Sequence, residues 1–350
     1  MREIAAGIAA AVLLLGCGAS TDTRAPSPTT TASVTPTPAA SPHPLEAAYE
    51  QVIKDVLPSI VQINTKVGLG SGIVYDTAGH IVTNAHVVGE ATELDVTTAG
   101  GSALKAKLVK SFSAGDLAVI KVDKPSGLRP ARFGDSSKLR VGQIVLAMGN
   151  PLGLSGSVTN GIISALGRTV SEPQNPGSPG ATIAGAIQTS AAINPGNSGG
   201  ALVDLSGHVI GIPTLAAIDP DLGGSAAPGI GFAIPSDTVT DIASQIIKQG
   251  KVTKSHRAAL GIRASTVIGE NGEPGGVGVV RVEPGGGAAK AGIQPGDVIV
   301  SINGKDTLTM AQLSEALTAL KPGDQARVGV VYPSGRTATL TVTLSQLSAD

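Results

Sequence analysis

The stretch Asn194-Pro-Gly-Asn-Ser-Gly-Gly200 constrains the fold and chemistry of this 350-residue chain more than any other segment. Glycine at 196 and 199 lets the backbone turn sharply around Ser198 and lets another molecule approach closely. Acyl transfer needs a nucleophile beside backbone amides that hold a developing oxyanion. Ser198 is therefore a candidate nucleophile, and the N–H groups of Gly196 and Ser198, with that of Asn197 between them, are candidate donors. Serine in a glycine-rich turn is also common without any catalytic role, so whether Ser198 is a nucleophile depends on the presence of a base and its partner elsewhere in the chain.

A hydroxyl nucleophile needs a base whose pKa lies near neutrality, and histidine is the usual supplier. The chain has five histidines. His86 lies in Thr83-Asn-Ala-His-Val-Val88, just past the strand-like pair Ile81-Val82. This placement favours His86 as the base. We expect the other four to be ordinary surface histidines: His43, His80, His208 and His256.

Asp116 stands at the head of the apolar segment Leu117–Val122. An aspartate at the start of a strand is usually a turn residue, but a carboxylate there can also orient the second imidazole nitrogen and stabilise the imidazolium. The chain order His86, Asp116, Ser198 is that of the triad in chymotrypsin-like double barrels. The spacing places His86 and Asp116 in one barrel and Ser198 in the next, with the site in the cleft between them.

The composition agrees with a mainly β architecture. Hydrophobic residues make up 41% and charged residues 15% of the chain, and 47 residues are glycine. About a dozen short strands are predicted between Ile60 and Ile234. Helices are expected near 45–56 and from Ser236, as cap, to a stop at Gly250, and two long loops at 170–182 and 214–229. The net charge of −1 gives no indication of nucleic-acid binding.

The first seventeen residues indicate export. Arg2 and an apolar run to Gly16 match the start and core of a secretory signal. Leu14-Leu-Gly-Cys17 resembles the lipobox of bacterial lipoproteins, so we expect a lipidated Cys17 that anchors the protein at the outer side of the cell membrane. An ordinary signal peptide with an incidental cysteine and an uncleaved anchor are the alternatives. Residues 18–44, rich in Pro, Thr and Ser, are expected to be a disordered tether.

Together these motifs resemble those of the HtrA (DegP/DegS-type) family of bacterial extracytoplasmic serine proteases. The matching blocks are Gly68–Val74, Thr83–Val87, Asp116–Val122, Met148–Gly153, Ile187–Thr189, Ala191–Gly200 and Gly231–Pro235. The resemblance implies a trypsin-like protease domain at 45–250, with His86 as base and acid, Asp116 as its orienter and Ser198 as nucleophile. It also implies ATP-independent cleavage of unfolded or misfolded proteins, often by a trimer. No cofactor or metal is expected.

The last ninety or so residues resemble a PDZ domain, a small α/β unit placed at 257–348. The resemblance makes Leu260, Gly261 and Ile262 the loop whose amides bind a peptide's C-terminal carboxylate. The following strand would pair with the peptide, and the predicted helix Met310–Leu320, with a capping box at Thr309 and Gln312, would form the other wall. The segment Gly292–Gly304 matches the most distinctive PDZ motif.

Specificity and regulation are predicted less directly. The pocket beside the nucleophile is expected to involve Ile193, Phe232, Ala233 and Ile234, which carry no carboxylate, so small or medium aliphatic residues (Val, Ala, Ile) are favoured before the cleaved bond. Ser190 stands where the resemblance would place Asp; we expect this difference to change the contacts of the local loop and not the chemistry. The short Lys66-Val67 loop favours a simple homotrimer. The alternative function is a catalytically latent chaperone or scaffold that binds peptides.

Overall fold

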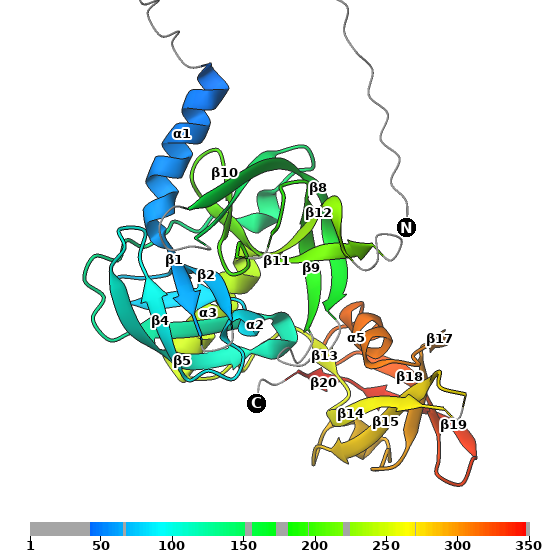
Figure 1. Cartoon of the computed structure of the whole chain (residues 1–350). Coiled ribbons are helices and arrows are strands. Elements are labelled where there is room, and N and C mark those ends of the chain that lie inside the picture. The colour runs from blue at the N-terminus through cyan, green and yellow to red at the C-terminus, as the bar shows by residue number, and fades with distance from the viewer. Residues whose placement is uncertain are drawn as a thin grey trace, which may run out of the picture. The chain divides into compact units, whose positions relative to one another are not determined.

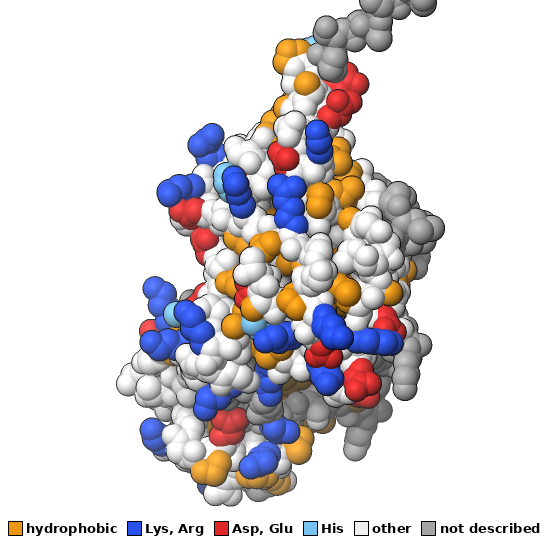
Figure 2. Space-filling model, turned by 90° about the vertical axis from the view of Figure 1, so that its left-hand side faces the viewer, with side chains coloured by type: hydrophobic (Ala, Val, Ile, Leu, Met, Phe, Trp, Pro, Cys, Tyr) orange, Lys and Arg blue, Asp and Glu red, His pale blue; other side chains and the backbone are white. Residues whose placement is uncertain are grey.

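A computed structural model describes residues 43–65, 68–150, 156–172, 181–194, 196–219, 225–269 and 271–347 (Figure 1). The predicted signal peptide with Cys17 and the tether up to residue 42 lie outside the described residues. Within these ranges no helix has both the length and the apolar character needed to cross a membrane. On the face in Figure 2, lysine and arginine side chains are spread over the surface with aspartate and glutamate among them.

The first barrel is a closed antiparallel sheet in the order β1-β2-β3-β6-β5-β4. Its side chains alternate between two environments, and Val61, Ile63, Ile81 and Ile120 are fully buried inside it. Such β-branched residues pack well on a pleated surface, which explains why these segments form strands. The strands are β1 (Ile60–Asn64), β2 (Leu69–Val74), β3 (His80–Thr83), β4 (Glu93–Thr97), β5 (Ala103–Phe112) and β6 (Leu117–Val122).

The second barrel is also closed and antiparallel, in the order β10-β11-β12-β9-β8-β7. Its strands are β7 (Ile144–Gly149), β8 (Ser157–Glu172), β9 (Ala181–Thr189), β10 (Ala201–Asp204), β11 (Val209–Asp219) and β12 (Ser225–Pro235). Part of each predicted long loop is strand: β8 and β9 pair out to Glu172 and Ala181, and β11 and β12 pair out to Asp219 and Ser225. Residues 173–180 and 220–224 lie outside the described residues. β12 runs through Pro228 and Gly229 although both residue types have low strand propensity, because its pairing with β11 holds on both sides of them.

Two helices cover a core that both barrels share. α1 (Pro44–Val56) and α3 (Ser236–Gln249) place Val56 and Ile246 in the same buried cluster as Leu146 and Val119 (Figure 1). α3 ends at Gly250, whose φ of 68° is the left-handed conformation that glycine adopts easily.

The predicted cap of α3 was wrong. Pro235 is the N-cap residue, and Ser236 is the first helical residue. The Ser236 hydroxyl donates to the Gly134 carbonyl at 2.8 Å, so it binds another segment of the chain rather than the amides of its own helix.

The C-terminal segment forms a unit with a core of its own, including Val277, Ile299, Val328 and Leu313. Its main sheet has the order β14-β15-β16-β18-β19, with β17 paired to β16, and β13 pairs with β20. Helix α5 begins with the predicted capping box of Thr309 and Gln312. The elements are β13 (Ala258–Ala259), β14 (Ile262–Ile268), β15 (Pro274–Val282), α4 (Gly287–Lys290), β16 (Val298–Ile302), β17 (Lys305–Asp306), α5 (Met310–Thr318), β18 (Gln325–Val331), β19 (Thr337–Thr343) and β20 (Ser345–Gln346).

Candidate active site

His86 and Asp116 meet at one end of the first barrel. His86 lies in α2 (Ala85–Val88), directly after β3, and Asp116 follows the single turn η2 (Ser113–Gly115). The His86 Nδ1 lies 2.9 Å from Asp116 Oδ2, and the His86 backbone N–H donates to Asp116 Oδ1 at 3.0 Å. Asp116 has a φ of 52°, an uncommon conformation outside glycine. The carboxylate therefore fixes both the imidazole and the start of its helix.

Two residues that sequence inspection did not single out hold Asp116 in place. Asn84 Nδ2 donates to the Asp116 carbonyl oxygen at 3.0 Å, and Thr214 Oγ1 donates to Asp116 Oδ2 in a short hydrogen bond. Asp116 is only 1% exposed, so it depends on such partners for the solvation that water would otherwise give. Asn84 stands inside the quoted histidine block, and Thr214 is the first residue of the predicted loop at 214–229, but nothing in the sequence pairs them with Asp116.

Ser198 lies between β9 and β10 in the second barrel. Its hydroxyl donates to the Thr214 carbonyl oxygen at 3.4 Å, so one residue, Thr214, contacts both Ser198 and Asp116. Gly199 has a φ of 79°, and a Cβ there would lie 2.1 Å from the Ser71 carbonyl oxygen. The structure thus explains the glycine after Ser198 by both backbone conformation and close approach.

The three candidate oxyanion donors differ in their hydrogen bonds. The Asn197 N–H donates to the Asn194 carbonyl at 3.0 Å. Among the hydrogen bonds between described residues, neither the Gly196 N–H nor the Ser198 N–H has an acceptor. A site for a developing oxyanion requires amides that are not already hydrogen-bonded, and these two have no acceptor among the described residues. Of the three candidate oxyanion donors, the N–H groups of Gly196 and Ser198 therefore remain.

The four predicted pocket residues do not lie on one surface. Ile193 and Ala233 belong to the buried cluster inside the second barrel, whereas Ile234 and Phe232 pack with the core shared by both barrels. Successive side chains of β12 point to opposite faces, which separates Ala233 from its neighbours. Ile193 lies against Gly231, where a Cβ would come within 2.4 Å of Ile193 Cγ1. Ile193 remains the candidate pocket residue nearest in sequence to Ser198.

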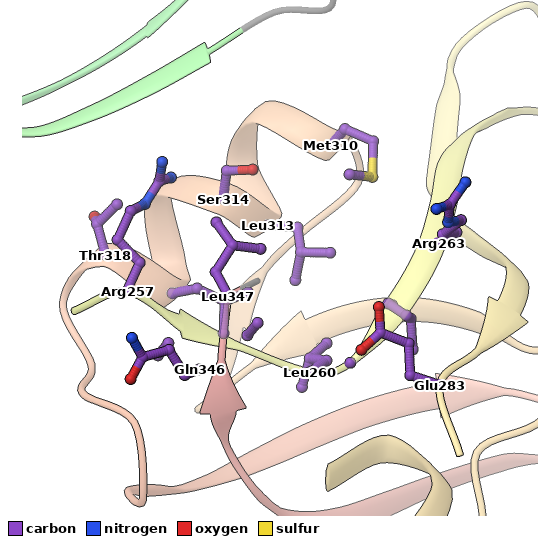
Figure 3. Close-up of a pocket in the computed structure, with 15 residues that line it drawn as sticks. Arg257, Leu260, Arg263, Glu283, Met310, Leu313, Ser314, Thr318, Gln346 and Leu347 are labelled. Atoms are coloured by element: carbon purple, nitrogen blue, oxygen red, sulfur yellow. The ribbon is translucent and has the colours of Figure 1, made fainter. Parts of the chain in front are cut away.

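The C-terminal unit contains a groove of about 200 Å³ between β14 and α5 (Figure 3). Leu260, Gly261 and Ile262 line it together with Met310, Leu313 and Leu317 from the helix. β14 is the edge strand of its sheet, so its outer backbone groups face the groove. An edge strand opposite an apolar helix wall is the arrangement that takes up an extended peptide.

Arg257 connects this groove with the active-site region. Its side chain is among those that line the groove (Figure 3). Its Nη1 donates to the Ala114 carbonyl oxygen in a short hydrogen bond. Burial lowers the pKa of the Arg257 guanidinium to about 10, which still leaves it charged at neutral pH. Ala114 lies in η2, the turn that leads into Asp116.

Comparison with known proteins agrees with this arrangement. Residues 70–212 match the trypsin-like peptidase domain family, and residues 278–331 match the PDZ domain family. A solved structure of the HtrA-type protease AlgW with a tripeptide is 34% identical, has a TM-score of 0.56, and is aligned over 86% of this chain and 98% of that one. The chain belongs to the HtrA family. Its fold is accordingly the predicted trypsin-like double barrel followed by one PDZ domain.

Two curated HtrA-like relatives give a similar picture. The periplasmic serine endoprotease DegP of Salmonella typhimurium is 40% identical over 80% of this chain and 57% of its own length. The serine protease PepD of Mycobacterium tuberculosis is 39% identical over 85% of this chain and 66% of its own length. The chain thus spans less than two thirds of the length of these relatives.

Two further polar residues of this HtrA family member, Ser190 and His80, make hydrogen bonds within the protease domain. Ser190 binds β8: its hydroxyl accepts from the Ile162 N–H at 3.0 Å. The prediction that His80 is a surface histidine was wrong, because His80 is 9% exposed and its Nδ1 lies 2.7 Å from Asp76 Oδ2. The ion pair with a carboxylate four residues earlier allows that burial.

We expect Thr214→Val to lower kcat/KM by about 10- to 100-fold, since a hydrogen bond to a charged group contributes about 1.5–3 kcal/mol. The change keeps the side-chain shape and removes only the donor to Asp116 Oδ2. Steady-state hydrolysis of a peptide substrate would measure the effect. Thr182→Val is the matched control, because Thr182 is 6% exposed and, among the described residues, its hydroxyl hydrogen-bonds only to the Ser171 hydroxyl. Equal activity of the two variants would contradict the role of Thr214.

Proposed function

We propose that this chain is a serine endopeptidase in which Ser198 is the nucleophile, His86 the general base and acid, and Asp116 the group that orients His86. The observation that carries the proposal is the 2.9 Å contact of His86 Nδ1 with a carboxylate that is 1% exposed. That contact engages Nδ1, so the proton transfer we propose takes place at Nε2, and the adjacent carboxylate stabilises the imidazolium that forms.

The chemistry follows from these positions. As Ser198 Oγ bonds to the substrate carbonyl carbon, its proton passes to His86 Nε2, and the carbonyl oxygen becomes an oxyanion held by the Gly196 and Ser198 amides. The imidazolium then gives that proton to the leaving amine as the C–N bond breaks. Water then attacks the acyl carbon as His86 Nε2 takes its proton, and His86 returns that proton to Ser198 Oγ as the ester C–O bond breaks, which releases the acid and restores Ser198.

The substrates we propose are unfolded or misfolded proteins outside the cytoplasm, cleaved without ATP after small aliphatic residues. Two observations support this class. DegP and DegQ, the latter from Escherichia coli, are described as periplasmic serine endoproteases. Ile193 lies beside the nucleophile loop, which we define as residues 194–200 around Ser198, and it is apolar and 9% exposed. A substrate side chain that contacts Ile193 is therefore better aliphatic than charged. We also propose that the protein is a homotrimer and that it acts in envelope quality control or stress signalling.

We expect a fluorophosphonate probe to label the wild-type chain and Ser198→Ala to abolish both labelling and cleavage of unfolded casein. The reason is that the probe reacts only with an activated serine. Gel fluorescence and casein degradation would measure the two effects. If the wild type binds casein but is never labelled, including with PDZ peptides present, the latent chaperone or scaffold is the correct function. Casein cleavage by Ser198→Ala would show that another residue is the nucleophile.

We propose further that peptide C-termini bound at Leu260–Ile262 regulate the protease through Arg257. The Arg257 side chain lines the groove, and its guanidinium binds the backbone two residues before Asp116. A terminal carboxylate in the groove is a competing partner for the same guanidinium, and such a group is strongly favoured by a buried cation. Peptide binding and the position of the η2 turn would then be coupled.

A peptide ending in Ala-Val-Leu with a free carboxylate should change kcat/KM by about fivefold or more, in the range of ordinary coupling energies. The same peptide with a C-terminal amide should have little effect. In Arg257→Met the response should be lost although fluorescence anisotropy still detects binding. Arg281→Met, which removes an exposed arginine, is the charge-matched control. A full response in Arg257→Met would refute this coupling.

We propose that lipidation of Cys17 holds the protein at the outer side of the cell membrane. The proposal rests on the lipobox-like Leu14–Cys17 stretch after an apolar run. Cys17→Ser should move the protein from the membrane fraction to the soluble fraction, because the acyl chains supply the membrane affinity. Fractionation and immunoblotting would measure this. Unchanged membrane association would leave an uncleaved apolar helix as the anchor.

A further inference from the structure

Ser71 of β2 is the centre of a hydrogen-bond cluster that joins the first barrel to the nucleophile loop of the second. Its hydroxyl donates to the Gly196 carbonyl oxygen at 2.5 Å and accepts from the Asn150 N–H at 2.8 Å. Its backbone N–H donates to the Ser198 carbonyl oxygen at 2.9 Å. Its own carbonyl accepts from Thr83 Oγ1 at 2.7 Å. Ser71 is fully buried, so water does not compete for these bonds.

The Ser71 hydroxyl fixes the direction of one peptide plane. A hydroxyl has a single hydrogen, and the Asn150 N–H occupies the acceptor side of the oxygen, so that hydrogen is directed at the Gly196 carbonyl. With the Gly196 carbonyl turned toward Ser71, the N–H at the other end of the same peptide, that of Asn197, points to Asn194. Both ends of this peptide are therefore tied.

Gly196 needs such a restraint more than another residue would. It has a φ of 99°, and glycine reaches both halves of the Ramachandran map at similar energy. Without the bond from Ser71, rotation about the 196–197 peptide would turn the Gly196 carbonyl into the space that the free amides border. A carbonyl oxygen there would repel an oxyanion instead of stabilising it.

We propose that Ser71 is a positioning residue for the oxyanion site: its hydroxyl holds the Gly196 carbonyl inward so that the Gly196 and Ser198 amides face the reacting carbonyl. The inference rests on the proposed endopeptidase function and adds a residue to it. Ser71 contacts neither the substrate-facing side of the loop nor the His86–Asp116 pair through its hydroxyl. Its effect must therefore appear in transition-state stabilisation and leave the base unchanged.

The test compares Ser71→Ala with Ser236→Ala in the full chain. Ser236 is also fully buried, and its hydroxyl also donates to a backbone carbonyl, that of Gly134, so the two changes remove the same groups in different places. Hydrolysis of a peptide p-nitroanilide with Val before the cleaved bond gives kcat and KM. A peptide boronate, which forms a tetrahedral adduct on the nucleophilic serine, reports oxyanion stabilisation directly.

We expect Ser71→Ala to lower kcat by about 10- to 100-fold, somewhat less than the loss of an oxyanion donor itself. KM should change by less than about threefold, and boronate affinity should fall by the same factor as kcat. The pH dependence of kcat/KM should keep its midpoint because the His86–Asp116 pair is intact. Ser236→Ala should lose stability with little loss of kcat.

Wild-type kcat and boronate affinity in Ser71→Ala would overturn the inference, and so would a displaced pH midpoint, which would indicate a general disturbance of the site. If Ser71→Ala does not fold, as shown by circular dichroism, Ser71→Cys serves instead, since a thiol is a weak donor of similar size. It should also show reduced kcat, and an unchanged kcat would refute the role. Failure of the wild type to react with fluorophosphonate would refute the endopeptidase function instead.

Discussion

Burial of the Asp116 carboxylate is the constraint on which the site depends. A carboxylate that is 1% exposed must be satisfied by the protein, and here its oxygens accept from the His86 backbone, the His86 ring and the Thr214 hydroxyl. The first two donors belong to the helix after β3, and the third belongs to β11 of the other barrel. The carboxylate therefore has all of its hydrogen-bond donors only when the two barrels are packed against each other. The site accordingly forms as the barrels associate during folding.

The same dependence holds for the nucleophile loop. It belongs to the second barrel, yet its carbonyls at 196 and 198 are bound by Ser71 from β2 of the first. Apolar packing supplies the attraction, since Ile73 and Val119 from the first barrel share a cluster with Leu146 and Ile212 from the second. The polar contacts then select one relative position from those that apolar packing alone would tolerate.

The sequence predicted most of the strands because short runs of β-branched and other apolar residues mark them, as in β1, β3 and β6. It also predicted which three residues carry the proposed chemistry, because their order is specific to one architecture. It could not predict Thr214 or Ser71. Their partners lie 98 and 125 residues away, and neither hydroxyl differs by local pattern from many others.

The errors have the same physical origin. The strand ends at Glu172 and Asp219 depend on cross-strand partners, which the local excess of glycine and proline does not reveal. Serine is a residue type that is common at helix N-caps, but the Ser236 hydroxyl donates to the Gly134 carbonyl and does not cap its own helix. His80 is buried because Asp76 lies within reach of its ring. Each outcome was decided by a neighbour in space.

The bond from Arg257 to Ala114 has a consequence for how such a link could persist during divergence. The acceptor is a main-chain carbonyl, which every amino acid supplies, so the side chain at 114 can change without breaking the contact. Only the arginine is constrained. A connection of this kind would leave no pair of co-varying positions, and methods that infer communication between sites from correlated substitutions would overlook it.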